Sequence, residues 1–211
     1  MVAEGMSLAS LLGAAHPLVD LAGTVVFALS GALVAARAGQ TPVTFAFFAV
    51  LTGVGGGTVR DLLIGAPVFW VFSPWAAAAC LVPAAAVWLA PARWWPERAI
   101  DWSDAAGIAW YGVYGSAKAL EFGVPPLPAA IMGVVSASAG GIMRDVLAGT
   151  PSIIMRPEIY VTAIALSAFA YVLLAALGVP PLLAAGVALF SGFGLRALAI
   201  LKGLALPAYK G

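Results

Sequence analysis

The chain has 211 residues, of which 63% are hydrophobic and 9% charged, with a formal net charge of +1 and a mean hydropathy of +1.05. A soluble domain carries about 25% charged residues, so this composition excludes a water-soluble globule. It also excludes a disordered chain and a nucleic-acid-binding module, because both need polar or basic residues that are scarce here. The expected fold class is an all-α integral membrane protein with about seven or eight spans.

Seven apolar segments follow one another along the chain, separated by glycine, proline or charged residues. They cover residues 18–38, 43–64, 74–90, 104–121, 127–148, 158–177 and 180–201. Residues 1–15 precede them and contain Glu4 but neither Lys nor Arg, so they lack the positive start of a cleaved signal peptide. We expect this segment to stay in the mature protein as an interfacial turn of helix.

The basic residues predict how seven spans are oriented. The loops after spans one, three and five share a side of the membrane with the C-terminus. That side carries Arg37, Arg93, Arg98, Arg156, Arg196, Lys202 and Lys210. The only candidates on the other side, Arg60 and Lys118, fall inside predicted spans. The charge distribution therefore places the C-terminus in the cytoplasm and the N-terminus outside, in the inner (plasma) membrane of the cell.

A shift of 84 residues aligns the chain with itself without a gap. The equivalent residues are Asp20 and Asp104, Gly23 and Gly107, Gly31 and Gly115, Gly39 and Gly123, Pro42 and Pro126, Gly56-Gly57 and Gly140-Gly141, Arg60-Asp61 and Arg144-Asp145, Gly65 and Gly149, and Pro67 and Pro151. The repeated unit covers three spans, 18–90 and again 104–177, so the second copy must be inverted relative to the first. Span seven, 180–201, lies outside the repeat, within one membrane domain of residues 1–211.

Spans two and five contain glycine runs, Gly55-Gly56-Gly57 and Gly140-Gly141. Each glycine costs about 1 kcal/mol relative to alanine inside a helix, so the runs predict a local break or kink in both helices. Broken helices of inverted repeats face each other and enclose permeant sites. Hydroxyls beside the breaks would line the pathway with freed carbonyls; these are Thr52, Thr58, Ser136 and Ser138. The alternative is that the glycines simply permit close helix packing.

Charged residues inside spans are costly and usually functional. Arg60-Asp61 lies near the outer end of span two, and Arg144-Asp145 lies near the inner end of span five. Because adjacent residues on a helix do not face each other, we expect each pair to contact other helices. The two aspartates would follow the breaks, near the positive end of a helix. The pairs are candidates for a gate or a pore lining, with a structural latch at each mouth as the alternative.

Three further charges need an explanation. Lys118 is a lone cation in span four, with Val34 at the equivalent position of the first copy. A charge that moves within a span responds to voltage by about 2.3 kcal/mol per 100 mV, so Lys118 is a candidate voltage sensor or gate. The alternatives are outward snorkelling or a pair with Glu121. Asp20 and Asp104 begin spans one and four, where helix N-capping explains both, with a cation-attracting vestibule as the second interpretation.

Patterns for catalysis and metal binding are absent from the sequence. One cysteine, Cys80, and one histidine, His16, cannot form an internal disulfide or a Cys/His zinc site. We expect Cys80 to be a small buried side chain and His16 to be an interfacial residue. No HExxH, GxSxG or GxxxxGK[ST] motif occurs. We therefore expect no enzymatic activity, no cofactor and no resident metal.

The segments GGGTVRDLLIGAPVFW and AGGIMRDVLAGTP, together with the seven-span layout, resemble the prokaryotic trimeric intracellular cation (TRIC) channels. This family is also described as a two-copy glycine transporter domain, and the resemblance covers about residues 16–203. It implies a homotrimer with one pore per protomer, formed among spans one, two, four and five and hinged at the glycine runs. It also implies permeation of monovalent cations, chiefly potassium, with Lys118 as the basic residue of the fourth span. One departure is Ala139, which stands where the first copy has Gly55.

The leading hypothesis is therefore a potassium channel opened by motion at the glycine runs. The alternative is a secondary transporter of glycine or another small solute, whose two gates never open together. A non-conducting scaffold is the third interpretation. The expected partners are further copies of the chain, membrane lipid and a permeant monovalent cation, without nucleic acid.

Overall fold

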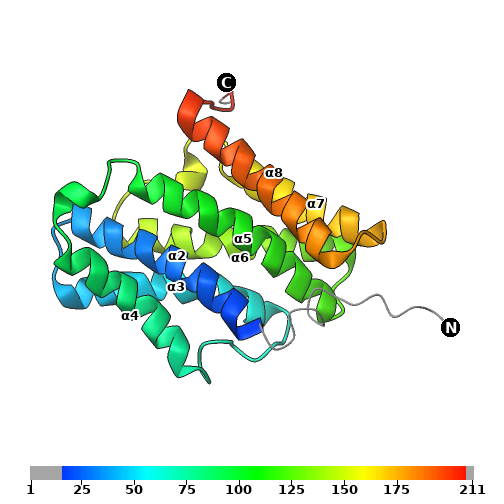
Figure 1. Cartoon of the computed structure of the whole chain (residues 1–211), viewed down its shortest axis with the longest axis horizontal. Helices are drawn as coiled ribbons and strands as arrows, with labels where there is room; N and C mark the ends of the chain where they lie inside the picture. The colour runs from blue at the N-terminus through cyan, green and yellow to red at the C-terminus, as the bar shows by residue number, and fades with distance from the viewer. Residues whose placement is uncertain (1–15, 208–211) are drawn as a thin grey trace.

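The structure, a computed structural model, describes residues 16–207, which form seven α-helices joined by short connections (Figure 1). The helices are α2 (His16–Arg37), α3 (Pro42–Leu63), α4 (Pro74–Leu89), α5 (Ala99–Glu121), α6 (Pro126–Leu147), α7 (Val161–Ala176) and α8 (Pro181–Lys202). Each predicted span corresponds to one helix, which confirms the all-α membrane fold. The expectations for residues 1–15, for the His16 side chain and for Lys210 fall outside the described part of the chain.

Proline and glycine mark the ends of these helices. Proline occupies the first turn of α3, α4, α6 and α8, where its missing N–H costs nothing. Glycines with positive φ follow six of the helices; they are Gly39, Gly65, Gly123, Gly149, Gly178 and Gly203. Left-handed backbone of this kind favours glycine and ends a helix. The ends of α3 and α6 therefore close in the same way, at equivalent glycines.

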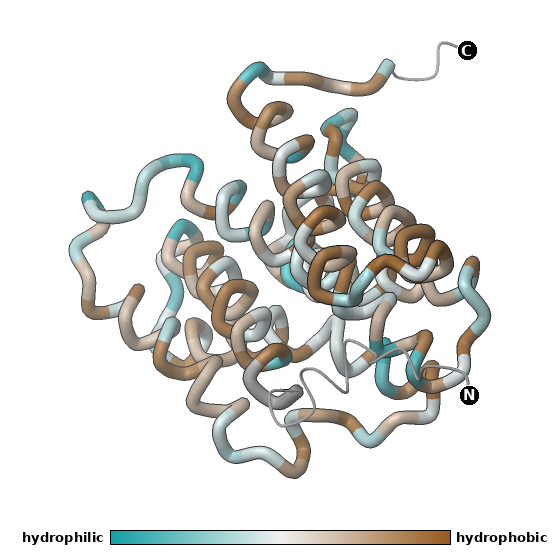
Figure 2. The backbone as a smooth tube through the Cα atoms, turned by 45° about the vertical axis from the view of Figure 1, so that its right-hand side comes forward, coloured by the Kyte–Doolittle hydropathy of each residue, from teal (hydrophilic) through white to brown (hydrophobic). Residues whose placement is uncertain are grey.

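The helices differ in how well they suit a lipid environment. Four of them are long and apolar enough to cross a membrane: Val19–Arg37 of α2, α3, α6 and α8. The apolar helices α4 and α7 are shorter, with 16 residues each. Helix α5 has 23 residues, contains several charged side chains and contacts α2, α6, α7 and α8. Figure 2 shows hydrophobic colour along most helical turns and hydrophilic colour mainly at the connections.

Two three-helix units make up the bundle. Helix α4 packs on α2 and α3, and α7 packs on α5 and α6 in the same way. The units meet where α3 contacts α6 and where α2 contacts α5, while α8 lies against α5 and α7 at one side (Figure 1). Cys80 is fully buried among apolar side chains of the first unit, as expected for a small hydrophobic residue.

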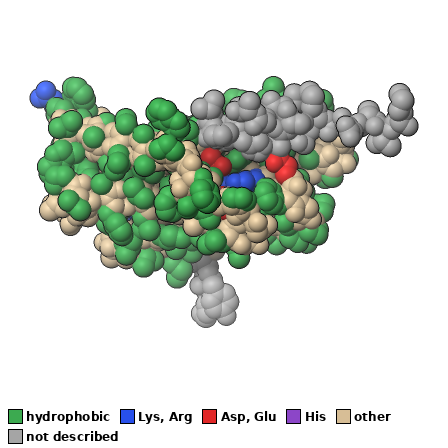
Figure 3. All heavy atoms as spheres, turned by 90° about the horizontal axis from the view of Figure 1, so that it is seen from below, with side chains coloured by type: hydrophobic (Ala, Val, Ile, Leu, Met, Phe, Trp, Pro, Cys, Tyr) green, Lys and Arg blue, Asp and Glu red, His purple; other side chains and the backbone are tan. Residues whose placement is uncertain are grey.

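The outer surface of the bundle is apolar. Large hydrophobic side chains are exposed on several helices, and Val43 of α3 and Leu89 of α4 are 78% and 79% exposed. Figure 3 shows one face covered mostly by hydrophobic side chains, with a small group of acidic and basic side chains in its middle. A surface of this kind is typical of contact with lipid or with another subunit.

The glycine runs do not break either helix. Helices α3 and α6 continue through them without interruption, so the prediction of a break with freed carbonyls is wrong. The glycines instead let the two helices cross closely. A Cβ atom added to Gly56 would lie 2.0 Å from the Ser136 carbonyl oxygen, and one added to Gly140 would lie 2.5 Å from the Thr52 carbonyl oxygen. Close packing at this crossing offsets the low helix propensity of glycine.

Candidate functional site

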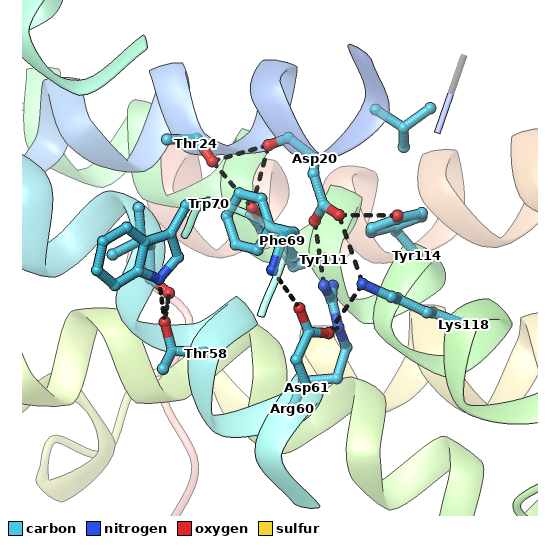
Figure 4. Close-up of polar contacts among 12 residues, drawn as sticks. Asp20, Thr24, Thr58, Arg60, Asp61, Phe69, Trp70, Tyr111, Tyr114 and Lys118 are labelled. Atoms are coloured by element: carbon cyan, nitrogen blue, oxygen red, sulfur yellow. Dashed lines mark hydrogen bonds and ion pairs between the residues drawn. The ribbon is translucent and has the colours of Figure 1, made fainter. Parts of the chain in front are cut away.

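Four charged side chains from α2, α3 and α5 meet in what we call the outer cluster, named for the predicted orientation: Asp20, Arg60, Asp61 and Lys118 (Figure 4). Arg60 Nη2 lies 3.2 Å from Asp20 Oδ1, and Arg60 Nε donates to Asp61 Oδ1 at 2.8 Å. Lys118 Nζ lies 2.9 Å from Asp61 Oδ1 and 3.7 Å from Asp20 Oδ2. All four residues are buried, and their formal charges cancel.

Neutral groups complete the outer cluster. The Tyr114 hydroxyl donates to Asp20 Oδ2 at 2.9 Å, and the Phe69 backbone N–H donates to Asp61 Oδ2 at 3.0 Å (Figure 4). The Tyr114 ring centroid lies 5.0 Å from the Arg60 guanidinium carbon, a cation–π distance. Each carboxylate therefore has both a cationic and a neutral partner. Among residues 16–207 only Arg60 Nη1 of the four charged side chains is buried without a hydrogen-bond partner, and a buried network of this kind holds one arrangement of its helices.

The inner cluster lies near the start of α5 and the end of α6, so that it is at the other end of α5 from Lys118. It consists of Asp104, Arg144, Asp145 and Ser30 of α2. Arg144 Nη1 lies 2.7 Å from Asp104 Oδ1, and Arg144 Nε donates to Asp145 Oδ1 at 2.9 Å. The Ser30 hydroxyl donates to Asp104 Oδ1 at 2.6 Å and also contacts Arg144 Nη1. The Ile153 backbone N–H donates to Asp145 Oδ2 at 3.0 Å.

The two clusters are equivalent under the 84-residue shift. Arg144 and Asp104 repeat the contact of Arg60 with Asp20. The contact of Ser30 with Asp104 likewise takes the place of the contact of Tyr114 with Asp20, and the contact of Ile153 with Asp145 takes the place of that of Phe69 with Asp61.

Charge distinguishes the two clusters. The position of Lys118 is occupied by Val34 in the inner half. The inner cluster consequently keeps a formal charge of −1. Asp104 Oδ2 is buried there without a hydrogen-bond partner among residues 16–207.

Each cluster forms the floor of a cavity. The outer cavity has a volume of about 550 Å³ and is lined by Asp20, Lys118 and Tyr114 together with aromatic side chains of the connection after α3. The inner cavity has a volume of about 290 Å³, and its charged lining residues are Asp104, Arg144 and Asp145 of the cluster together with Arg37, Asp101 and Arg156. The bundle is thus hollowed at equivalent places in its two halves, and a buried ion-pair cluster closes each hollow.

Two hydroxyls mark the region where α3 and α6 cross. Thr52 Oγ1 and Ser136 Oγ are buried and have no hydrogen-bond partner within the described part of the chain. They are equivalent under the 84-residue shift, and each residue lies against a glycine of the opposite helix. Buried hydroxyls are normally hydrogen-bonded, and water supplies the partner where protein does not. The two hydroxyls are therefore the buried polar groups at this crossing that still need a partner.

The other two predicted hydroxyls bond to their own helices. Thr58 Oγ1 donates to the Val54 carbonyl oxygen at 2.7 Å and accepts a hydrogen bond from Trp70 Nε1 at 2.8 Å. Ser138 Oγ donates to the Val134 carbonyl oxygen at 2.8 Å. Among the four predicted hydroxyls, only those of Thr52 and Ser136 lack a hydrogen-bond partner.

The arginine–aspartate pairs differ from the prediction in two respects. Each arginine contacts an aspartate on another helix, as expected, but it also contacts its own neighbour, because its long side chain can fold back to the next residue. Asp61 and Asp145 do not follow a break: they lie in the last turns of α3 and α6. Backbone N–H groups of the following connections hold their carboxylates there.

Asp20 and Asp104 were missed as cluster residues. The prediction that they are N-caps is wrong, because α2 begins at His16 and α5 at Ala99, at least one turn earlier. Their side chains are 4% and 0% exposed and bind the two buried arginines. One signal was available in the sequence, since each aspartate precedes its arginine by the same 40 residues. Lys118 points into the outer cluster, which excludes the snorkelling alternative.

The described residues contain no group of three or more His, Cys, Asp or Glu side chains placed to hold a metal ion. The fold and the site instead define a multi-pass membrane protein whose two inverted copies carry equivalent buried ion-pair clusters. A family model described as "Glycine transporter" matches the chain twice, at residues 17–92 and 101–176, and both limits differ by the 84 residues of the internal repeat.

Solved structures and curated relatives agree with this match. The TRIC trimeric intracellular cation channel orthologue from Rhodobacter sphaeroides is 41% identical, with a TM-score of 0.82 over 89% of this chain and 97% of that one. A UPF0126 membrane protein of Vibrio cholerae is 36% identical over 91% of this chain and 82% of its own length. The inner membrane protein YadS of Escherichia coli is 39% identical over 69% of this chain and 72% of its own length. The chain belongs to the family of prokaryotic TRIC channels.

Proposed function

We propose that the chain is a potassium-permeable cation channel that assembles as a homotrimer with one pore in each protomer. Family membership supports a channel over an enzyme, because the similar solved structures are TRIC cation channels. The observation that carries the proposal is the pair of cavities in the two halves of the bundle, with two unpartnered hydroxyls at the helix crossing between the copies. In this conformation, buried ion pairs close both ends of the pathway.

The two clusters are the proposed gates. Ion pairs buried at both mouths hold the helices together, and a conducting pathway requires that their side chains separate. The glycine contacts between α3 and α6 are the proposed site of helix motion, because close backbone contacts allow sliding without side-chain interlocking. The inner cluster contributes a charge of −1, but Arg37, Asp101 and Arg156 line the same cavity, so its charged side chains sum to zero and preference for cations rests on family membership.

The proposed location is the inner membrane, with the N-terminus outside and the C-terminus in the cytoplasm. In support, the arginines assigned to the cytoplasmic side gather at one end of the bundle. Arg37 contacts the Glu97 carbonyl oxygen, Arg98 donates to the Ile200 carbonyl oxygen at 2.9 Å, and Arg196 pairs with Glu158 at 2.8 Å.

Reconstitution in planar bilayers tests the proposed function. We expect unitary current steps whose reversal potential follows the potassium gradient and is unaffected by the chloride gradient. A folded, reconstituted protein without unitary currents under any applied voltage would contradict the channel proposal.

The second candidate function is a secondary transporter of glycine or another small solute. The description of the matching family model favours it, and closure at both ends also fits an occluded transporter. Uptake of labelled glycine into vesicles, driven by an ion gradient and without unitary currents, would favour this candidate over the channel.

Lys118→Val is expected to preserve the fold and to change the voltage dependence of the current. The variant gives the outer cluster the same charged residues as the inner one, where Val34 occupies the equivalent position. It removes a charged contact to Asp61, worth about 1.5–3 kcal/mol, and a longer one to Asp20, and leaves the contacts of Arg60 in place. Voltage-step recordings on wild type and variant measure the effect. An unchanged voltage dependence would show that Lys118 is not the sensor.

A further inference from the structure

A polar cleft of about 240 Å³ lies apart from the two ion-pair clusters, between the start of α5, the end of α8 and the connection before α7. We call it the C-terminal cleft. Four charged side chains line it, two of each sign: Arg98, Asp101, Glu158 and Arg196. Charges that face a half-open cleft at the end of a membrane bundle need partners, so the contacts of these four residues decide what the cleft can bind.

Two of the four charges are used within the protein. Arg196 Nη2 donates to Glu158 Oε2 at 2.8 Å, and Arg196 Nη1 donates to the Ile159 carbonyl oxygen at 3.3 Å. Arg196 is 1% exposed and lies over the Tyr160 ring. The chain returns beside this pair after α8, where Ala205 forms an isolated antiparallel bridge with Glu158. This wall of the cleft is therefore satisfied and held in place.

The other two charges have no ion-pair partner within residues 16–207. The guanidinium of Arg98 donates to the Ile200 carbonyl oxygen at 2.9 Å, which leaves its remaining N–H groups available. Asp101 is half-buried and makes no side-chain hydrogen bond or ion pair with a described residue; Arg196 and Arg37 act on its charge from a distance, but Arg196 is already paired with Glu158 and Arg37 with the Glu97 carbonyl oxygen. A partly desolvated charge without a direct hydrogen-bond partner is costly. An unpaired cation and an unpaired anion in one cleft match a ligand that carries both charges.

An exposed apolar stripe leads along α8 to this cleft. It has two parts, Val187 with Phe190 and Leu198 with Leu201, which are 47–72% exposed and separated by eight residues, about two turns of the same face. Leu204, which is 41% exposed, continues the stripe into the wall of the cleft. A charged cleft at the end of an apolar stripe fits an amphipathic ligand better than a free polar solute.

We propose that the C-terminal cleft binds the headgroup of a phosphoethanolamine lipid. The phosphate oxygens accept hydrogen bonds from Arg98, the ammonium group donates to the Asp101 carboxylate, and the acyl chains lie along α8. This assignment is independent of whether the protein conducts ions. Asp101 also lines the inner cavity, so an occupied cleft changes the charge at the inner mouth.

Native mass spectrometry of the purified full chain in detergent tests the assignment. Three phospholipids with identical acyl chains serve as probes, with ethanolamine, choline or glycerol headgroups. We expect the ethanolamine lipid to bind at least about tenfold more tightly than the glycerol lipid, since only the former supplies a charged donor to Asp101. The choline lipid should bind with intermediate affinity, because its quaternary ammonium carries charge but no donor.

Two variants separate the roles of the charges. Asp101→Asn is expected to reduce the preference for ethanolamine over glycerol to less than about threefold, because the loss of one charge-assisted contact removes most of a tenfold difference. Arg98→Gln is expected to weaken all three lipids alike, because all contain phosphate. Arg93→Gln is the matched control, since Arg93 is exposed on the same connection and does not line the cleft.

Three results would overturn the proposal. Equal binding of the three lipids by the wild-type protein would contradict recognition of the headgroup without recourse to any variant. A full ethanolamine preference in Asp101→Asn would exclude the assigned ammonium contact. Glycerophosphoethanolamine, which lacks acyl chains, is the last probe: if it displaces the lipid at equal concentration, the cleft binds a free zwitterion and the stripe on α8 has no part in it.

Discussion

Replacing Arg144 with glutamine is expected to lower the free energy of unfolding by about 3–5 kcal/mol or to prevent folding. Removing one partner of a buried ion pair leaves an uncompensated charge, which accounts for a loss of this size. In the inner cluster, Arg144 is the cation that contacts both Asp104 and Asp145, and its side chain is 2% exposed. Thermal or detergent-induced unfolding of the purified protein, followed by circular dichroism, measures the change.

Arg60→Gln provides the matched comparison. Its effect is expected to be smaller than that of Arg144→Gln, because Lys118 stays 2.9 Å from Asp61 and retains one positive charge in the outer cluster. Arg93→Gln, at an exposed position, should change stability by less than about 0.5 kcal/mol. Equal losses for Arg60→Gln and Arg144→Gln would contradict the compensating role of Lys118.

The second large effect concerns the helix crossing. Gly56→Ala is expected to destabilise the protein by about 1–3 kcal/mol or more, as overpacking of a tight interface does. The new methyl group would lie 2.0 Å from the Ser136 carbonyl oxygen, which belongs to the backbone and cannot rotate away. Helices α3 and α6 would have to move apart. Gly140→Ala should act similarly, because its methyl group would lie 2.5 Å from the Thr52 carbonyl oxygen.

Gly186→Ala is the control for the crossing. Gly186 lies inside α8 with no atom within 4 Å of an added Cβ, so alanine there should stabilise the helix by up to about 1 kcal/mol.

The folded Gly56→Ala, Gly140→Ala double variant should also carry less cation flux than the wild type in liposomes. Undiminished flux in that variant would argue against motion at the crossing.

Much of the fold was predictable from the sequence, because the signals that determine it are local or periodic. Proline and glycine bounded the spans, and most of the predicted ends lie within three residues of the observed ones. The exception is α5, which begins at Ala99 instead of 104. Its first turn contains Asp101 and was assigned to the loop because charged residues resemble a loop in hydropathy.

The details of the site depended on tertiary contacts that composition does not contain. A glycine run predicts a weak helix when a span is considered alone. The free-energy cost of glycine relative to alanine is small, however, and close packing against a neighbouring helix offsets it. The roles of Asp20 and Asp104 were hidden for a similar reason. An aspartate near a helix start resembles an N-cap in the sequence. Its role as an ion-pair partner becomes visible only when the helix is seen to begin a turn earlier and to place the carboxylate beside an arginine of another helix.

The difference between the two clusters gives the pathway an electrical polarity. The halves repeat each other in backbone and in contacts, yet the outer cluster is neutral and the inner one carries −1 because Val34 stands opposite Lys118. A conduit whose two ends differ in buried charge passes unequal currents at equal and opposite voltages. Rectification would thus have one source in a single side chain, alongside the unequal volumes of the two cavities, about 550 and 290 Å³.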